Sequence, residues 1–578
     1  MMMQISRTWL HGLGGTLLLG VVVGCMSTSA PIERGTPVER FNSAFHAFKK
    51  GATKKAYATW KALAVQGMPE AQYNLGKMYE DGEGIDRDLA EAARWYQAAA
   101  FQGMTSAQYN LAGMYSKGQG VPVQLPQALH WLSEAAGHGH GKAMFHLGML
   151  YRDGQQVDPD LVQAKRWLKQ ASEAGVKIAE LEYALLLSDS DRVAEQQRAV
   201  PKLEALAAQG QLQAIVKLGQ VYLEGRGVSP NFGLAKQWFE QAISKKSPTA
   251  KYFLGEMYAS GSGVDKNLNK AEILWTSAAQ AGVARAQYRL AERFKKNITR
   301  ALVWYTGAAE QGYAPAEYAL CDILVNGKGV TADPREGLSW CKKAAARNFP
   351  AAQFRMGYAM MQGQWMAKDI DRGFELIRDA ANRNVADAQF QMGMLYQYGI
   401  GTQKDRRVAM KWYRKAVKNG QPQAQYQMGR FYLLGEGVPR NLQKALRLIH
   451  GSADQELAVA QTTLGMLYEQ GIDGTKRYED AEHWYTKAVR QNYPLAQYHL
   501  GLLYTNGLGV TRDLKRSKKL ITQAANGGLP QAMYMLGQMY EEGRGVAQDS
   551  DVAMQWFQKA AEKGYGKARR VVRAVASE

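Results

Sequence analysis

The chain repeats nearly the same residues at a fixed interval, and one alanine marks each copy. That alanine recurs at Ala71, Ala107, Ala143, Ala179, Ala214, Ala250, Ala286, Ala316, Ala352, Ala388, Ala424, Ala460, Ala496 and Ala532. The steps between these residues are 36, apart from one of 35 and one of 30. A fixed period of this length indicates one supersecondary unit stacked many times. The chain is therefore expected to be a solenoid, stabilised by contacts between neighbouring units.

Each copy begins with an apolar stripe of helical spacing. We number the positions of a copy from its alanine, which is position 0. Position 4 is usually Leu or Met, position 5 a small residue and position 8 Tyr, as in Leu75, Gly76 and Tyr79. Positions 0, 4 and 8 share one side of a helix. A glycine inside a helix costs about 1 kcal/mol relative to alanine, so its recurrence at position 5 predicts close approach of another helix.

A glycine turn and a second helix complete the copy. Gly82-Glu83-Gly84 is a typical turn, because glycine readily adopts the positive φ that ends a helix. The second helix carries a large aromatic pair such as Trp95-Tyr96, and we expect the tryptophan at position 24, for example Trp95 or Trp412, to be a packing residue. Its start is marked by Asp or Asn side chains that can cap the first turn, worth about 1 kcal/mol each. These residues are Asp88, Asp160, Asn231, Asn267, Asn297, Asp333, Asp369, Asp405, Asn441, Asp513 and Asp549. Each copy is thus a helical hairpin, and we predict an all-α chain of about fifteen helix pairs.

The sequence motif of each copy resembles the Sel-one-like repeat, a relative of the tetratricopeptide repeat. The matching residues are Ala71-Gln72-Tyr73-Asn74-Leu75-Gly76, Tyr79, Gly82-Glu83-Gly84, Ala92, Trp95-Tyr96 and Ala99. The resemblance covers residues 71–567 as fourteen repeats, with a degenerate first repeat at 39–70 and a capping helix at 568–578. It implies a right-handed αα-hairpin superhelix that serves as an adaptor or scaffold. The 179–213 copy lacks the turn glycines and the 286–315 copy has lost six residues, so we expect irregular curvature at both.

The N-terminus carries a different signal. Residues 1–24 contain one positive side chain, Arg7, and a short apolar stretch that is typical of a secretion signal. Val22-Val23-Gly24-Cys25 resembles the bacterial lipobox, in which the cysteine becomes the lipidated first residue. The alternative is an ordinary signal peptide cleaved nearby. Position 26 is Met rather than Asp, which by resemblance to sorting rules favours the periplasmic face of the outer membrane. Residues 25–38 then form a flexible tether.

Two further cysteines, Cys321 and Cys341, lie in one copy at the positions of Gly76 and Tyr96. Small cysteine-rich members of the resembled family pair the positions of Gln72 and Ala100, which face each other across the hairpin. By that resemblance, Cys321 and Cys341 also face each other, one turn closer to the loop. An oxidising periplasm would allow a disulfide. The alternative is two buried thiols.

The chain is strongly basic. Its formal net charge is +20, and removal of Arg7 with the signal leaves +19. Such a field favours anionic partners, for example an acidic polysaccharide, peptidoglycan, lipid head groups or an acidic envelope protein. The secretion signal argues against nucleic acid. The alternative is that lysines and arginines such as Lys411 and Arg414 simply solvate the outer helix faces.

No set of residues has the spacing of a catalytic site, and we predict no enzyme activity, cofactor or metal. Four histidines, His130, His138, His140 and His146, lie within 17 residues and could bind Zn²⁺ or Cu²⁺. However, His138-Gly139-His140-Gly141 reads as an exposed loop, and no nearby cysteine completes a structural site.

A partner is expected to bind side chains that vary at positions 3 and 6 of the first helix, because packing does not dictate them. The candidates are Asn74, Lys77, Asn110, His146, Lys217, Arg289, Arg355, Gln391, Gln427, Arg430 and His499. The alternative is that they are merely solvated. The leading hypothesis is a non-catalytic periplasmic scaffold, similar in architecture to the alginate-secretion repeat lipoproteins and so connected with exopolysaccharide secretion or envelope assembly. The alternative is a cell-wall glycan-binding protein or a hydrolase-like enzyme.

Cys25→Ser is expected to abolish lipid attachment, because in the resembled lipobox the lipid is first attached to the cysteine sulfur. Labelling of cells with a fatty-acid analogue, followed by membrane fractionation, measures this. A variant that still labels and stays with the membrane would refute the lipobox interpretation.

Overall fold

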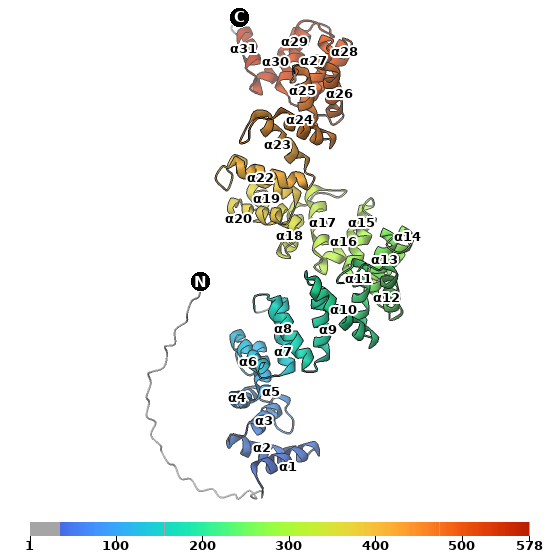
Figure 1. Cartoon of the computed structure of the whole chain (residues 1–578). Helices are drawn as coiled ribbons and strands as arrows, with labels where there is room; N and C mark the ends of the chain where they lie inside the picture. The colour runs from blue at the N-terminus through green and yellow to red at the C-terminus, as the bar shows by residue number, and fades with distance from the viewer. Residues whose placement is uncertain (1–34, 155–156, 473, 577–578) are drawn as a thin grey trace, which may run out of the picture. The chain divides into compact units, whose positions relative to one another are not determined.

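A computed structural model describes residues 35–154, 157–472 and 474–576, which form 31 α-helices and their connecting turns, with no strand among them (Figure 1). The predicted signal at 1–24 and the predicted lipidation site Cys25 lie outside the described residues. Each odd-numbered helix from α1 to α29 pairs with the helix that follows it. The prediction of an all-α chain of helical hairpins is therefore confirmed.

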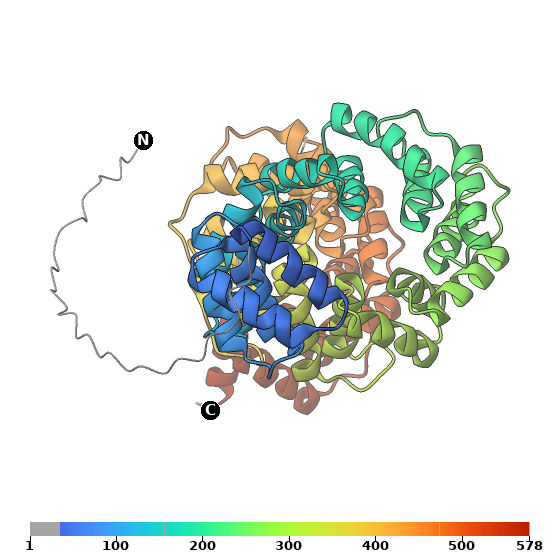
Figure 2. The ribbon, with the colours of Figure 1, turned by 90° about the horizontal axis from the view of Figure 1, so that it is seen from below.

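The chain divides into two compact units, residues 1–246 and 247–578. Within the first unit each hairpin packs on the next, and Figure 2 shows its first pair, α1 and α2, side by side in dark blue. The helices of this unit are α1 (Pro37–Lys49), α2 (Thr53–Val65), α3 (Pro69–Asp81), α4 (Leu89–Phe101), α5 (Thr105–Lys117), α6 (Leu125–Gly137), α7 (Gly141–Asp153), α8 (Leu161–Glu173), α9 (Lys177–Ser188), α10 (Val193–Ala208), α11 (Leu212–Glu224) and α12 (Phe232–Ser244).

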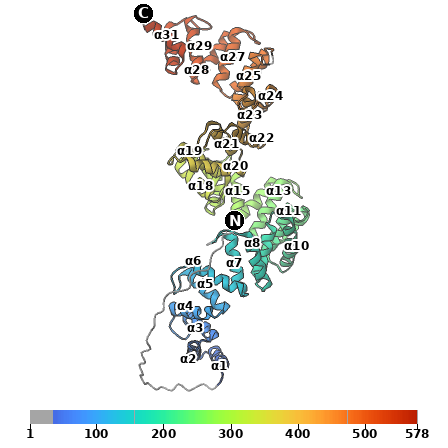
Figure 3. The same cartoon turned by 60° about the vertical axis from the view of Figure 1, so that its left-hand side comes forward.

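The second unit continues the same pattern, and Figure 3 shows its hairpins in chain order from green to red. Its helices are α13 (Pro248–Ser260), α14 (Leu268–Gln280), α15 (Ala284–Arg293), α16 (Ile298–Glu310), α17 (Ala314–Asn326), α18 (Pro334–Ala346), α19 (Pro350–Gln362), α20 (Ile370–Asn382), α21 (Ala386–Tyr398), α22 (Arg406–Lys418), α23 (Pro422–Leu434), α24 (Leu442–Asp454), α25 (Ala458–Gln470), α26 (Tyr478–Val489), α27 (Pro494–Asn506), α28 (Leu514–Asn526), α29 (Pro530–Glu541), α30 (Ser550–Glu562) and α31 (Gly566–Ala576).

The two ends of the repeat array differ from its middle. Helix α1 begins at Pro37 behind a capping box made by Thr36 and Glu39, so helix begins within the range 25–38 that was expected to be a tether. At the other end, α31 packs against α30. Residues 568–576 of the expected capping segment lie in this helix.

All eleven Asp and Asn residues predicted to cap the second helices do so. In each case the side-chain oxygen accepts a hydrogen bond from a backbone N–H in the first turn of its helix. Asp88, for example, accepts from the amides of Ala90 and Glu91 at 2.9 and 3.0 Å. These donors have no partner inside the helix, so the cap fixes where each second helix begins.

The turn glycines have separate roles. Gly82 ends α3 in the left-handed conformation, with φ of 71°. The second glycine of the next turn, Gly120, packs directly on the backbone of Leu89 at the start of α4, in the preceding hairpin. A side chain at Gly120 would overlap that backbone. The second turn glycine is thus a contact between repeats as well as a turn residue.

The two helices of a hairpin come closest where the small residue at position 5 faces position 25. A Cβ atom on Gly76 would lie 2.9 Å from the Tyr96 ring, and one on Gly537 would lie 2.7 Å from the Phe557 ring. Tyr96 is 0% exposed and Phe557 is 1% exposed. The close approach predicted from the recurring glycine is therefore an aromatic ring of the second helix lying on the first.

The aromatic pair of the second helix is divided between two environments. We expected the tryptophan at position 24 to be the packing residue, but Trp95 and Trp412 are only half-buried. The buried rings are those of the next residues, Tyr96 and Tyr413. Lys415 lies over the exposed side of Trp412, with its ammonium 4.1 Å from the ring centroid. The pairing follows from helix geometry, because position 27 is one turn from position 24.

A glutamine at position 1 ties several repeats to the ones before them. Gln72 donates from Nε2 to the carbonyl of Ala64, at the end of the preceding second helix, at 3.1 Å. Gln102 in turn donates to Oε1 of Gln72 at 2.7 Å. The same bond to the preceding helix is made by Gln108, Gln287, Gln389 and Gln461. The amide therefore adds a second hydrogen bond to a carbonyl at the helix end, such as that of Ala64, which also accepts the backbone N–H of Gly67.

The two irregular copies keep the hairpin but change its helix lengths. In the 179–213 copy, α10 extends to 16 residues with Pro201 inside it. In the shortened 286–315 copy, α15 has 10 residues. Among the described residues, the helices are too short or too polar to cross a membrane.

Gly537→Ala should destabilise the last repeat by about 1–2 kcal/mol, because the added methyl group overlaps the Phe557 ring and the gain in helix propensity offsets only part of that cost. Adding Phe557→Leu should relieve this overlap, so the two substitutions together should cost less than the sum of their separate costs, because Ala112 and Leu132 already occupy these two positions together. Urea unfolding followed by circular dichroism measures both. Equal stability of Gly537→Ala and the unchanged protein would contradict the packing described here.

Candidate binding site

The predicted binding residues all lie on first helices, and several of them connect neighbouring repeats. Arg289 Nε lies 2.8 Å from Glu256 Oε1, and Arg355 donates to Oδ1 of Asn326 at 2.9 Å. Lys217 forms an ion pair with Asp189. In each case the partner lies in the preceding first helix or, for Asp189, directly after its end. The variation at position 3 therefore has a structural component that was not expected, since these side chains bridge repeats.

The remaining candidates are distributed along both units. His499 Nδ1 lies 3.3 Å from Glu469 Oε2. Lys77 is exposed, and partly buried side chains are found at Asn74, Gln391, Gln427 and Arg430. The structure brings only one pair of candidates, Asn110 and His146, into a common pocket among those described.

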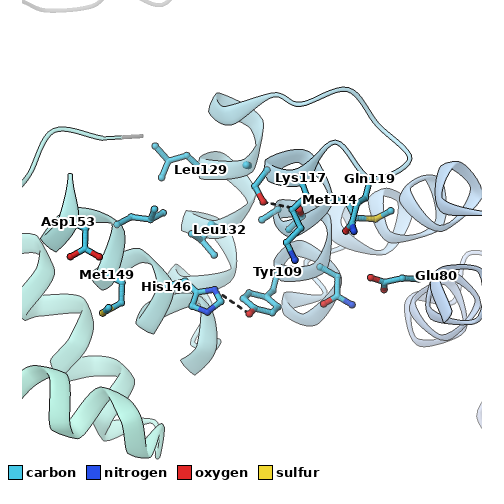
Figure 4. Close-up of a pocket in the computed structure, with 16 residues that line it drawn as sticks. Glu80, Tyr109, Met114, Lys117, Gln119, Leu129, Leu132, His146, Met149 and Asp153 are labelled. Carbon is cyan, nitrogen blue, oxygen red and sulfur yellow. Dashed lines mark hydrogen bonds between the residues drawn. The ribbon is translucent and has the colours of Figure 1, made fainter. Parts of the chain in front are cut away.

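This pocket lies in the first unit, between α3, α5, α6 and α7 (Figure 4), and has a volume of about 420 Å³. Its walls are apolar, with Leu129, Leu132 and Met149 among the residues that line it. Charged and polar side chains line its remaining surface, including Glu80, Lys117, Asp153 and the two candidates Asn110 and His146. An apolar cavity with a few polar groups is the usual form of a ligand site.

The pocket lies at the α5–α6 hairpin, whose residues at positions 5, 9 and 25 differ from those of the α3–α4 hairpin. In the α3–α4 hairpin, Tyr96 fills the space over Gly76, and its hydroxyl donates to Glu80 at position 9, at 2.6 Å. In α5–α6 the corresponding three residues are Ala112, Leu132 and Ser116, and all three line the pocket. Other hairpins with an aliphatic residue at position 25 carry a larger one at position 9, such as Met361 or Leu433. Here position 9 is the smaller Ser116.

Gly113 widens the same space. It occupies position 6, and it is the only glycine at that position in the fourteen copies. A Cβ atom added to Gly113 would meet no atom within 4 Å, so close packing does not require this glycine. A glycine inside a helix is unfavourable by about 1 kcal/mol, and its effect here is to leave the pocket unfilled.

Tyr109 separates the pocket from a second hollow. Its hydroxyl lies 3.3 Å from Nδ1 of His146, and its ring stacks on His140 with centroids 4.7 Å apart. Burial lowers the pKa of both histidines, and the nearby cation Lys142 lowers it further. Burial also raises the pKa of Tyr109. All three groups are thus neutral near pH 7, and they act as hydrogen-bonding rather than charged groups.

The four clustered histidines do not converge. His140 uses Nδ1 to accept the backbone N–H of Ala143 at 3.2 Å, and the His130 ring lies tilted against the Trp131 ring, with centroids 5.0 Å apart. Across the described part of the chain, no three His, Cys, Asp or Glu side chains come together in a way that could hold a metal ion.

Cys321 and Cys341 are joined in a disulfide that links α17 to α18, with their Cα atoms 5.3 Å apart. Both residues are 0% exposed. They occupy positions 5 and 25, so the covalent bond stands where Gly76 and Tyr96 pack in the α3–α4 hairpin. The surrounding side chains include Val325, Leu338 and Met356.

Comparison with known families identifies the repeat. The model of the Sel1 repeat matches residues 69–104, 105–140, 141–176, 212–247, 248–283, 284–313, 314–349, 350–385, 386–421, 422–456, 458–493, 494–529 and 530–565. The chain belongs to the Sel1 repeat family. Residues 177–211 lie between two matched Sel1 repeats without a match of their own, although they form the hairpin of α9 and α10.

Solved structures similar to this Sel1 repeat chain include three bacterial proteins. A protective antigen of uropathogenic Escherichia coli strains is 26% identical, with 89% of this chain and 97% of that chain covered and a TM-score of 0.41. A Sel1 repeat protein from Oxalobacter formigenes is 31% identical, with coverages of 42% and 98% and a TM-score of 0.40. The immunity protein Pa5087 from Pseudomonas aeruginosa is 21% identical, with coverages of 37% and 81% and a TM-score of 0.28. No curated protein sequence matches the chain.

Sequence reasoning selected Asn110 and His146 but missed the residues that make their pocket. Gly113, Ser116 and Leu132 are each unremarkable alone. The sequence could have shown the pocket only through the combination of the three residues. In this copy position 6 has no side chain, and positions 9 and 25 both lack a large side chain.

Gly113→Ala should raise the free energy of unfolding by about 1 kcal/mol, because the added methyl group improves helix propensity and meets no neighbour. Urea unfolding of this variant, alongside Gly537→Ala as the crowded counterpart, measures the difference. Loss of stability in Gly113→Ala would show that the space beside it is filled.

Proposed function

We propose that this Sel1 repeat protein is a non-catalytic scaffold of the bacterial cell envelope that binds protein partners through its first helices. The observation that carries this proposal is the pocket formed by α3, α5, α6 and α7, which contains Asn110 and His146. It lies across three successive repeats, so a ligand there would contact several hairpins at once. Stacked repeats commonly use such a surface to bind other proteins.

The proposed location is the periplasmic face of the outer membrane, with a lipid on Cys25. The disulfide between Cys321 and Cys341 supports an oxidising compartment, because cytosolic reductants keep most thiols reduced. The secretion signal and the sequence Val22-Val23-Gly24-Cys25 support export and lipid attachment. Neither the signal nor Cys25 is among the described residues, so Cys25→Ser labelling remains the direct test.

The basic charge supports partners with acidic surfaces. Helix α22 exposes Arg407, Lys411, Arg414 and Lys418 and contains no acidic residue. A surface of one sign attracts an oppositely charged partner over distances of about 10 Å at 0.1 M salt. Acidic envelope proteins are the partners that we propose, and exopolysaccharide secretion or envelope assembly is the proposed setting.

Site-specific photo-crosslinking tests the proposal. A diazirine-bearing residue in place of Asn110 or His146 should capture an envelope protein in living cells, because both side chains line the pocket. A matched residue at position 94 should not, since Arg94 lies on the second helix α4 with its side chain 75% exposed.

Mass spectrometry of the captured product distinguishes the outcomes. Equal capture from positions 110 and 94, or none from 110 and 146, would contradict the proposal. A glycan-linked product from position 110 would instead support the glycan-binding alternative.

A further inference from the structure

We infer that the pocket between α3, α5, α6 and α7 accepts a tyrosine side chain from an extended segment of a partner protein. This inference deepens the proposed scaffold function and rests on it for the identity of the partner as a protein. The chemistry of the pocket itself can be tested without any partner.

The chain shows what occupies the corresponding space in its other hairpins. Tyr96 donates its hydroxyl to Glu80, and Tyr485 donates to Glu469, both at 2.6 Å. Tyr413 makes the same bond to Oε1 of Gln397, also at 2.6 Å. A phenol ring with its hydroxyl bonded to position 9 is therefore a native occupant of this space.

In the α5–α6 hairpin this phenol is missing and nothing replaces it. Leu132 ends short of the space that the ring would fill, Ser116 is small, and its hydroxyl donates to the carbonyl of Gly113 at 2.8 Å. Gly113 contributes no side chain. The resulting volume of about 420 Å³ lies within the range of about 300–1,000 Å³ found for ligand pockets. It accommodates an aromatic side chain together with part of its backbone.

The lining suits a phenol better than a sugar or an anion. Leu129, Leu132 and Met149 provide an apolar wall, and methionine sulfur interacts favourably with aromatic rings. Lys117 offers a donor to a hydroxyl, Glu80 and Asp153 offer acceptors (Figure 4), and two carboxylates to one ammonium group disfavour an anion.

A second hollow makes an extended segment the natural carrier of the tyrosine. This hollow is lined by Tyr73, Ser106 and His140, among others, and it shares Tyr109 and Asn110 with the pocket. The two hollows therefore adjoin along the first helices. A peptide with its tyrosine in the pocket would pass Tyr109 and place a neighbouring residue in the second hollow.

The test uses p-cresol, which is the tyrosine side chain alone, and the full chain with ¹³C-methyl-labelled methionine. Met114 and Met149 both line the pocket, so their methyl signals report its occupancy. Substitution of each methionine by leucine assigns the two signals. We expect p-cresol to shift them saturably, and 4-methylcyclohexanol, which has a similar size without an aromatic ring, to bind at least fivefold more weakly.

Two variants fill the pocket by different means. Gly113→Leu should weaken p-cresol binding at least tenfold, and the open space around Gly113 allows this variant to fold. The double variant Ala112→Gly with Leu132→Tyr gives positions 5 and 25 the residues of the α3–α4 hairpin and should have the same effect. Gln538→Leu, at position 6 of the last repeat, is the matched control and should leave p-cresol binding unchanged.

The inference is overturned if neither methionine signal responds saturably to p-cresol, or if binding is equally strong in both filled variants and the unchanged protein. It is also overturned if galacturonate, as a uronic acid probe, shifts the two signals and p-cresol does not. Saturable p-cresol binding without protein capture from positions 110 and 146 would support the pocket's chemistry and refute the scaffold proposal. Protein capture without p-cresol binding would refute the tyrosine pocket alone.

Discussion

The structure depends on one close contact, between position 5 of the first helix and position 25 of the second. Glycine at position 5 lets an aromatic ring lie directly on the helix backbone, as Tyr96 does on Gly76. The helix gives up about 1 kcal/mol of propensity at each such glycine, and burial of a large ring more than offsets this. In most hairpins a large side chain, either aromatic or aliphatic as Ile377 is on Gly357, lies on a glycine in this way, so the contact sets the spacing of these helix pairs. Where the contact changes, the local properties of the solenoid change as well.

Much of the hairpin was predictable because its determinants are local. A cap such as Asp88 acts within one turn of helix, and a turn glycine such as Gly82 acts on its own φ, so both can be read from the order of residues. The glutamine series was not predicted, since the bond from Gln72 to Ala64 joins two repeats. The choice between Trp412 and Tyr413 failed for a related reason. Both positions look apolar, and only the facing helix decides which ring is buried.

The candidate site was less predictable than the fold because it is defined by missing side chains. Variation at position 3 pointed to Asn110 and His146, which do line the pocket. The same variation also selected Arg289 and Lys217, whose ion pairs connect repeats. Periodicity cannot separate these two roles, because each depends on which residue the neighbouring repeat presents. The pocket arises only where Gly113, Ser116 and Leu132 coincide.

The disulfide of the α17–α18 hairpin gives one repeat a mechanical property that the others lack. Hairpins of a solenoid hold together through neighbours, so melting or pulling that begins at one end can pass from repeat to repeat. Cys321 and Cys341 are 20 residues apart in sequence, and their disulfide keeps α17 and α18 joined after the adjacent hairpins have unfolded. The segment between them cannot be drawn out under tension until the bond is reduced. This hairpin is therefore a stop point, and the length of chain that can be extended depends on the redox state of its surroundings.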